Sequence, residues 1–403
     1  MTTEKQLEAQ LEVFERGAVD LIDRAELSRK IAASLKSGKP LRVKFGMDPS
    51  SPDLHLGHAV HLMKLRDMQE LGHQVVLIVG DATAMVGDPS GRNKLRPTLT
   101  REQVQANMET YTSQAALVLD MERTEVRYNF EWFGKMGFSE ILTLCGRMTV
   151  ARMLERDTFE KRMKDGEAIG IHEFLYPLMQ GWDSVEIRSD VELGATDQLF
   201  NILSARQLQE QEQQAPQICL THPLIMGTDG RKMSKSYGNA IGLTDEPGDM
   251  FGKVMSIDDE SMETWFTYLT RVPTAELPAL LAGHPREAKA RLAREITAFY
   301  HGAEAATAAA EGFDRQFRDK QLPDDIPEVA FPGEWQADGV PLAILLREVK
   351  LAASSSEARR LIQQGGVKVD GEVMREPSAQ LAPPAEALLI QVGKRRFARV
   401  RKS

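Results

Sequence analysis

The sequence has few of the features that mark a secreted, membrane-bound or metal-holding protein. Only two of its 403 residues are cysteine, Cys145 and Cys219, too few for a disulfide framework. No apolar run approaches the ~20 residues needed to cross a bilayer, and the N-terminus lacks the continuous apolar segment of a secretory signal. Histidines and cysteines do not cluster with metal-ligand spacing. These absences predict a cytoplasmic protein with no protein-bound metal and no membrane partner.

Charge is unevenly distributed along the chain. The formal net charge is −9, but residues 340–403 hold 12 Lys and Arg against 6 Asp and Glu, which leaves −15 on the preceding 339 residues. A basic terminal module on an acidic body is typical of a protein that binds nucleic acid through one part only. A tail that serves only solubility is the alternative.

Apolar periodicity predicts an α/β architecture at the start of the chain. The strand-like segment 41–47, the helical pattern 54–71 and the strand-like segment 73–80 form one βαβ unit, which implies parallel strands. Further strands are predicted at 183–195 and 217–225. The helix predicted at 196–212 has Thr196 or Asp197 as its cap. A chain of this length divides into about two to four domains.

The rest of the chain is predicted to form helical segments and a small terminal domain that contains both helices and strands. Helical patterns are predicted at 5–36, 101–170 and 246–318. Four prolines and little periodicity mark 322–341 as a linker. A helical pair and short strands follow it. The predicted domains are 1–245, a helical domain at 246–321, the linker at 322–340 and a terminal domain at 341–403.

The stretch "DPSSPDLHLGH" (48–58) lies where the first predicted strand passes into a helix. The N–H groups at a helix N-terminus attract anions. His55 and His58 lie one turn apart, and Gly57 lets a flat group approach the backbone. This pattern is compatible with a nucleotide whose phosphates lie near His55 and Ser50. Two structural histidines near a helix cap are the alternative.

A second stretch, "GRKMSKS" (230–236), places Lys232 and Lys235 on a glycine-flanked loop. Two ammonium groups suit pyrophosphate, whose charge grows as it leaves; taken alone, such a loop is a solvated turn. Together, "HLGH" and "KMSKS" resemble the two signature motifs of class I aminoacyl-tRNA synthetases. The resemblance implies an ATP site. Its residues would be Ser50, His55, Gly57, His58, Asp197, Lys232, Ser234 and Lys235, of which His55, His58, Lys232 and Lys235 would be catalytic.

The stretch "YPLMQGWD" places Tyr176, Gln180 and Asp183 on one helix face. Buried polar groups need partners, either in an interhelical network or in a ligand with an ammonium and a hydroxyl. Here the chain resembles the bacterial tyrosyl-tRNA synthetases. The resemblance implies that Asp183 accepts the phenolic hydroxyl of tyrosine, while Tyr176 and Gln180 hold its α-ammonium.

Further tyrosine contacts follow from the same resemblance. In "GDATAMVGDPSGR" (80–92), Asp88 would face the ammonium with Thr83 nearby, and Asp48 would lie at the pocket floor. In "ELGATDQ" (192–198), Asp197 would bind the adenylate ribose and Gln198 the substrate.

The chain departs from the better-known bacterial branch at Lys44, Phe45 and the pair Leu199-Phe200. That branch has a second hydroxyl partner, a tyrosine, at the position of Lys44, a cysteine at Phe45 and an aromatic-glycine pair at Leu199-Phe200. With its intact "KMSKS", this chain resembles the second bacterial branch. The Lys44 ammonium would either pair with Asp183 or take over part of the hydroxyl contact.

The resemblance predicts a Rossmann-like parallel-sheet catalytic domain with a helical insertion at about 105–178, then a helical domain and a small α+β S4-like RNA-binding domain. It implies that tyrosine and ATP form tyrosyl-adenylate, with Mg²⁺ bound through the phosphates, before tyrosine passes to its tRNA. The insertion implies a homodimer, and no DNA partner is expected. A tryptophanyl enzyme is the nearest alternative, because it shares both signatures. A non-catalytic RNA-binding protein on the same scaffold is another.

Overall fold

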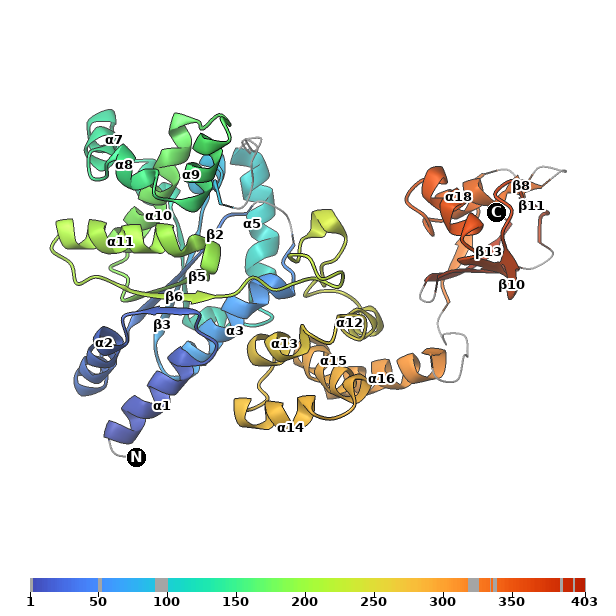
Figure 1. The fold of residues 1–403 in the computed structure, drawn as a ribbon, viewed down its shortest axis with the longest axis horizontal. Helices are drawn as coiled ribbons and strands as arrows, with labels where there is room; N and C mark the ends of the chain where they lie inside the picture. The colour runs from blue at the N-terminus through green and yellow to red at the C-terminus, as the bar shows by residue number, and fades with distance from the viewer. Residues whose placement is uncertain are drawn as a thin grey trace. The chain divides into compact units, whose positions relative to one another are not determined.

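The computed structural model describes residues 3–49, 53–90, 101–317, 326–333, 335, 339–384, 387–393 and 396–402. Its chain forms two compact units, Met1–Glu311 and Gly312–Ser403 (Figure 1). In the described part of the chain, no helix is long and apolar enough to cross a membrane.

The first unit is built on a six-stranded sheet of order β1-β6-β5-β2-β3-β4. Its strands are β1 Asp20–Ile22, β2 Arg42–Met47, β3 Gln74–Val79, β4 Thr124–Tyr128, β5 Val191–Ala195 and β6 Ile218–His222. All neighbours run parallel except β1, which is antiparallel to β6. The predicted parallel-sheet α/β class is confirmed. Strand order reverses direction between β2 and β5, and ligands of such sheets bind outside the carboxyl ends of the strands at this point.

Helices cover both faces of the sheet. We call residues 230–236 the lysine loop. The helices that precede it in the chain are α1 Thr3–Glu15, α2 Arg24–Ser37, α3 Leu56–Glu70, α4 Thr83–Val86, α5 Arg101–Ala115, α6 Phe130–Phe133, α7 Phe138–Cys145, α8 Val150–Met153, α9 Asp157–Lys164, α10 Leu175–Glu186 and α11 Leu199–Gln211. The crossover through α3 leads from β2 to β3, whereas the crossover through α11 leads from β5 outward to β6. Because right-handed crossovers in opposite directions use opposite faces, α3 lies on one face and α11, with its neighbour α10, on the other (Figure 1).

Several predicted boundaries are wrong. The segment 101–170 is not helical throughout, because β4 (Thr124–Tyr128) pairs in parallel with β3. The segment 183–195 is a strand only at Val191–Ala195, since α10 continues to Glu186. Neither Thr196 nor Asp197 caps the following helix, because Thr196–Gln198 is a 3-10 turn and α11 begins at Leu199. The pattern at 5–36 also contains the short edge strand β1.

Five further helices follow the lysine loop, as the periodicity of 246–318 predicts. They are α12 Pro247–Val254, α13 Met262–Leu269, α14 Leu277–Leu281, α15 Pro285–His301 and α16 Ala303–Phe317. Their contact faces bury Phe251, Trp265, Phe266 and Leu292 completely or nearly so.

The second unit packs two helices, α17 Leu342–Glu348 and α18 Ser355–Gln363, with a five-stranded sheet of order β10-β9-β12-β13-β7. The strands are β7 Glu328–Ala330, β9 Val367–Val369, β10 Glu372–Met374, β12 Ala387–Val392 and β13 Arg396–Arg401, and β8 Val340–Pro341 pairs separately with β11 Gln380–Leu381. The predicted linker is therefore wrong in part. Residues 328–330 form β7, parallel to β13, and Phe331 is buried in the core of this unit.

Candidate active site

A cavity of about 670 Å³ opens at the carboxyl ends of β2, β3 and β5. Every site residue predicted from the sequence lines it, apart from Ser50, which lies outside the described residues. The lining residues among those predicted are Asp48, His55, Gly57, His58, Thr83, Asp88, Tyr176, Gln180, Asp183, Asp197, Gln198, Lys232, Ser234 and Lys235. Residues from segments almost 190 positions apart in the sequence therefore line the same cavity.

The histidine turn, residues 55–58, caps the N-terminus of α3. His55 is the N-cap, and its Nδ1 accepts the N–H of Gly57 at 3.2 Å, while His58 Nδ1 accepts the N–H of His55 at 3.2 Å. With Nδ1 an acceptor in both rings, the proton of each neutral imidazole is assigned to Nε2. A Cβ on Gly57 would lie 2.9 Å from the His55 ring, so a larger residue here would displace that ring.

Burial keeps both imidazoles neutral. It lowers the pKa of His55 to about 4, with a smaller contribution from Lys235, and it lowers the pKa of His58 well below 6.5, assisted by His55. Near pH 7 each ring is therefore a neutral donor whose Nε2–H is left for a ligand at the helix N-terminus.

The lysine loop is anchored from inside by two buried residues, Met233 and Asn239. Asn239 Oδ1 accepts the N–H of Ser234 at 2.8 Å, and its Nδ2 donates to the carbonyl of Lys232 at 3.1 Å. Lys232 and Lys235 remain partly exposed. The Lys232 ammonium lies 3.4 Å from Asp197 Oδ2, and that of Lys235 pairs with Asp53. Their charges are thus available to an anion that displaces these carboxylates.

Asp48 forms the floor of the cavity. The Tyr176 hydroxyl donates to its Oδ2 at 2.8 Å, and the Thr83 hydroxyl donates to Oδ1 at 2.7 Å. A Cβ on Gly80 would lie 2.1 Å from this carboxylate, so only glycine fits beside it. Burial raises the pKa of Tyr176 well above 10, with Asp48 the next cause, and the phenol therefore stays a donor.

Asp183 holds the deep end of the cavity and has partners that the sequence did not predict. Trp132 Nε1 donates to its Oδ1 at 3.0 Å, and Asn129 Nδ2 donates to its Oδ2 at 3.3 Å. Burial raises the pKa of Asp183 to about 7, partly offset by Lys44 and by these two donors. A carboxylate oxygen has lone pairs for more than one donor, so Asp183 retains the capacity to accept a ligand hydroxyl.

Asp88 lies at the rim with Gln198. Gln198 Nε2 donates to Asp88 Oδ2 and to Ser90 Oγ, both at 2.8 Å. The buried Arg156 was not predicted as a site residue; its Nη2 lies 3.4 Å from Asp88 Oδ1.

Lys44 is fully buried, and its ion-pair partner is Glu192 at 3.0 Å. The alternative in which it pairs with Asp183 is therefore wrong. Lys44 acts on Asp183 only through its charge, which lowers the pKa of that carboxyl.

A parallel-stranded sheet with a histidine turn and a dilysine loop at its carboxyl edge is the arrangement expected of the class I aminoacyl-tRNA synthetases. Residues 36–318 match the family model described as tRNA synthetases class I (W and Y), and residues 340–383 match the S4 domain. The first model covers more than half of the chain, which therefore belongs to this family.

Comparison with known relatives identifies tyrosine as the amino-acid substrate of the group to which this chain belongs. The chain is 50% identical to a tyrosine–tRNA ligase of Bordetella avium over 98% of this chain and 97% of that protein, and 48% identical to one of Moorella thermoacetica over the same shares. A C-terminally truncated mitochondrial tyrosyl-tRNA synthetase of Aspergillus nidulans superposes with a TM-score of 0.64 at 25% identity, covering 78% of this chain and 99% of that one. The chain is thus a member of the tyrosine–tRNA ligases, and the tryptophanyl alternative is not favoured.

Proposed function

We propose that the cavity carries out both half-reactions of tyrosine–tRNA ligation with the residue roles set out below. The carboxylate of tyrosine attacks the α-phosphorus of ATP, pyrophosphate leaves, and a hydroxyl of the terminal adenosine of tRNA then takes the tyrosyl group. The single observation that supports these roles most strongly is that His55, Lys232 and Asp183 line one cavity. An ATP-sized ligand and a tyrosine end to end would contact both halves of it.

The ATP half would act by alignment and charge stabilisation. His55 and His58 would donate their Nε2–H groups to phosphate oxygens without adding positive charge. Lys232 and Lys235 would leave Asp197 and Asp53 and follow the negative charge that develops on pyrophosphate. Asp197, once released, would accept the ribose hydroxyls. ATP would enter with Mg²⁺ held by its phosphates, as a substrate complex.

The tyrosine half would select its substrate at both ends. Asp183, held by Trp132 and Asn129, would accept the phenolic hydroxyl. Tyr176, Gln180, Gln198 and Asp88 would surround the α-ammonium, with Thr83 and Asp48 supporting them from the floor. A site built to bond a hydroxyl rejects an amino acid that lacks one, because its own polar groups are then left unpaired.

The test is ATP–pyrophosphate exchange with each of the twenty amino acids. We expect exchange with tyrosine only, followed by charging of tyrosine tRNA. Exchange with tryptophan in place of tyrosine would overturn the selectivity assigned to Asp183. The absence of exchange with every amino acid would support an RNA-binding protein without catalysis.

The second unit would bind the tRNA. Arg359, Arg360, Arg399 and Arg401 are exposed on α18 and β13, whereas Ala398 and Val400 of the same strand are buried. Cationic side chains on such a surface bind backbone phosphates. We assign catalysis to about residues 1–245, contact with the anticodon side of tRNA to residues 246–321, and further tRNA binding to the terminal domain. We propose that the enzyme acts in the cytoplasm.

A homodimer is proposed from the surface of the segment between β4 and β5. Five apolar side chains there are more than half exposed: Phe138, Leu142, Val150, Met163 and Ile171. Exposed apolar side chains gathered in one segment indicate a protein interface. Light scattering on the wild type and on Ile171→Asp would test this, with a dimer expected for the first and a shift toward monomer for the second.

A further inference from the structure

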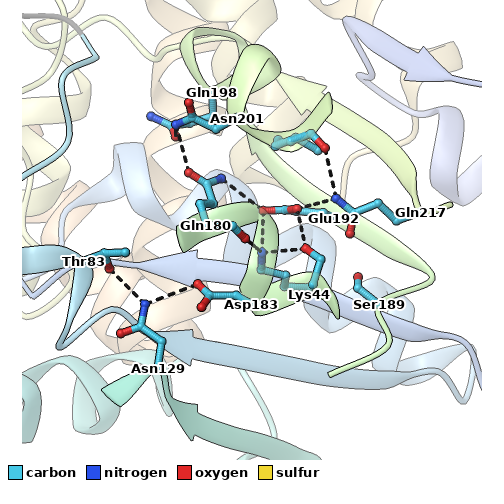
Figure 2. Close-up of polar contacts among 12 residues, drawn as sticks. Lys44, Thr83, Asn129, Gln180, Asp183, Ser189, Glu192, Gln198, Asn201 and Gln217 are labelled. Carbon is cyan, nitrogen blue, oxygen red and sulfur yellow. Dashed lines mark hydrogen bonds and ion pairs between the residues drawn. The ribbon is translucent and has the colours of Figure 1, made fainter. Parts of the chain in front are cut away.

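A buried ion pair lies behind the amino-acid end of the cavity (Figure 2). Lys44 on β2 and Glu192 on β5 are register partners in the sheet, and their side chains are 0% and 1% exposed. Lys44 Nζ lies 3.0 Å from Glu192 Oε1. Neither residue lines the cavity. Two charges are expensive to bury unless each has further hydrogen bonds, so their remaining partners show what the pair does.

Most of those partners belong to α10, the helix that carries the predicted tyrosine contacts. Lys44 Nζ donates to the carbonyl of Gln180 at 2.7 Å and to Ser184 Oγ at 2.8 Å. The Ser184 hydroxyl donates in turn to Glu192 Oε2 at 3.0 Å. The pair therefore holds the main chain of α10 at Gln180, midway between Tyr176 and Asp183.

Glu192 also sets the direction of a side-chain amide. Gln180 Nε2 donates to Glu192 Oε1 at 3.1 Å. An ionised carboxylate accepts hydrogen bonds and cannot donate them, so Gln180 must turn its nitrogen toward Glu192 and its oxygen away. That oxygen accepts from Asn201 Nδ2 at 3.0 Å and has a second lone pair for a cation in the cavity.

The orientation of the Gln180 amide is linked to the orientations of two further side-chain amides, those of Asn201 and Gln198. The buried Asn201 uses the same Nδ2 group to donate to Gln198 Oε1 at 2.9 Å (Figure 2). Gln198 therefore turns its own Nε2 toward Asp88, at 2.8 Å. The chain of three amides thus has a carboxylate acceptor at each end, Glu192 beside Gln180 and Asp88 beside Gln198, and both acceptors favour the same direction.

We propose that the Lys44–Glu192 ion pair is a positioning pair for the amino-acid site, which turns the Gln180 oxygen toward the α-ammonium of the substrate and so sets affinity for that group. The inference rests on the proposed function. Glu192 supplies the acceptor at the Gln180 end of the amide chain, and the Lys44 ammonium compensates its charge inside the sheet. Glutamine at position 192 could donate as well as accept, so Gln180 would lose the acceptor that fixes its direction from this end of the chain.

The experiment measures binding of three probes: tyrosine, tyramine, and 3-(4-hydroxyphenyl)propanoic acid, which lacks the ammonium. They are compared in the wild type, in Glu192→Gln and in Lys44→Met/Glu192→Gln, whose buried site carries no charge. We expect both variants to bind tyrosine and tyramine about tenfold more weakly, as for a lost hydrogen bond to a charged group. Binding of the propanoic acid should change by less than about twofold, and the KM for ATP should stay unchanged.

A matched control separates positioning from simple loss of stability. Lys64 is another buried lysine, whose Nζ donates to the carbonyls of Val13 and Arg16 and which does not line the cavity. Lys64→Met should lower the melting temperature while preserving the ratio of tyramine to propanoic acid affinity. Equal weakening of all three probes in the double variant, or unchanged tyramine binding, would overturn the proposal. Failure of the proposed function is a separate result, since it would appear in the wild type as absence of tyrosine-dependent exchange.

Discussion

The main-chain N–H of Leu56 donates to the carbonyl of Ile241 at 2.9 Å, which ties the first turn of α3 to the segment that follows the lysine loop. The adjoining residues His55 and Gly242 form an isolated β-bridge. The histidine turn and the segment that follows the lysine loop, about 185 residues further along the chain, are thereby joined through their backbones. Lys232 and Lys235 can therefore move to a ligand while the base of their loop stays in place.

Removal of the Lys235 ammonium should slow adenylate formation and leave tyrosine binding nearly unchanged. Under the proposed role its contact would strengthen as charge develops on pyrophosphate, so Lys235→Ala should cost on the order of 2–4 kcal/mol of transition-state stabilisation. Pre-steady-state adenylation and equilibrium tyrosine binding measure the two quantities, with Arg231→Ala as the control from the same loop. A changed tyrosine dissociation constant at an unchanged adenylation rate would contradict the role.

Asp183→Ala should reduce discrimination between tyrosine and phenylalanine. The carboxylate is the expected acceptor for the substrate hydroxyl, and removing it also frees Trp132 Nε1 and Asn129 Nδ2. Discrimination in sites of this kind comes from polar groups left unpaired by the wrong substrate, tyrosyl-tRNA synthetases being a known example. The measurement is kcat/KM in pyrophosphate exchange for both amino acids. An unchanged ratio would assign hydroxyl recognition to another residue.

The pH dependence of kcat/KM for tyrosine should follow the ionisation of the Asp183 carboxyl group. Its pKa is raised to about 7, chiefly by burial, so the accepting carboxylate predominates above pH 7 and is lost as the pH falls below it. We expect kcat/KM for tyrosine to decrease from pH 8 to pH 6 with an apparent pKa near 7, since kcat/KM reports ionisations of the free enzyme. Asp183→Asn should remove this transition. A wild-type profile that is level across this range would contradict the assignment.

Acid should destabilise the first unit through its buried histidines. Burial lowers the pKa of His61 and that of His73 to about 4. Unfolded imidazoles titrate near 6.5, so between pH 6.5 and 4 the unfolded chain binds protons that the folded chain does not. The free energy of unfolding is therefore fully present above pH 6.5 and falls as the pH drops, by roughly 1–2 kcal/mol per histidine between pH 7 and 5. Thermal melts across this range should show a shallower slope for His73→Gln, and an identical slope would refute its contribution.

Removal of the second unit should separate amino-acid activation from tRNA charging. A fragment ending at residue 325 keeps the cavity and removes β7 with the rest of its sheet, whereas a cut near Asp338 would leave β7 and Phe331 without their core. The fragment should retain tyrosine-dependent exchange and charge tRNA poorly, with residual charging that improves as tRNA concentration rises. For the full chain, charging should weaken steeply with salt, because the cationic side chains proposed to bind tRNA would contact mainly phosphates. Full charging by the fragment at ordinary salt would reduce the basic unit to a solubilising tail.

Much of the first unit could be predicted because its signals are local. The runs at β2, β3 and β6 are continuous and buried, and the helix of Tyr176, Gln180 and Asp183 follows from spacing alone. The two signature motifs predicted the ATP-side residues on the histidine turn and the lysine loop, and the resemblance to the tyrosyl-tRNA synthetases predicted the remaining cavity residues. The helical pair and strands of the second unit follow in the same way.

The failures occur where long-range contacts decide the structure. Strand β4 lies at the edge of the sheet and carries Glu125 and Arg127, whose ion pairs replace the apolar run expected of a buried strand. Because β4 was missed, Asn129 and Trp132, which follow it, were missed as partners of Asp183. The alternating pattern of "TEVRY", followed by polar Asn129, was the available signal. The partner of Lys44 could not be predicted, since Glu192 is 148 positions away and only the β2–β5 register brings the two together.

The buried pair of Lys44 and Glu192 constrains how this pocket can change by mutation. Replacing either residue alone leaves one uncompensated charge in the sheet, a change that typically costs several kcal/mol. Replacing both leaves a neutral interior. Viable descendants should therefore carry both charges or neither, and a library that varies the two positions independently would consist mostly of poorly folded members. Directed evolution toward tyrosine analogues has a wider path through Asp183, which lines the cavity, and its two donors Asn129 and Trp132, because changes there leave the ion pair intact.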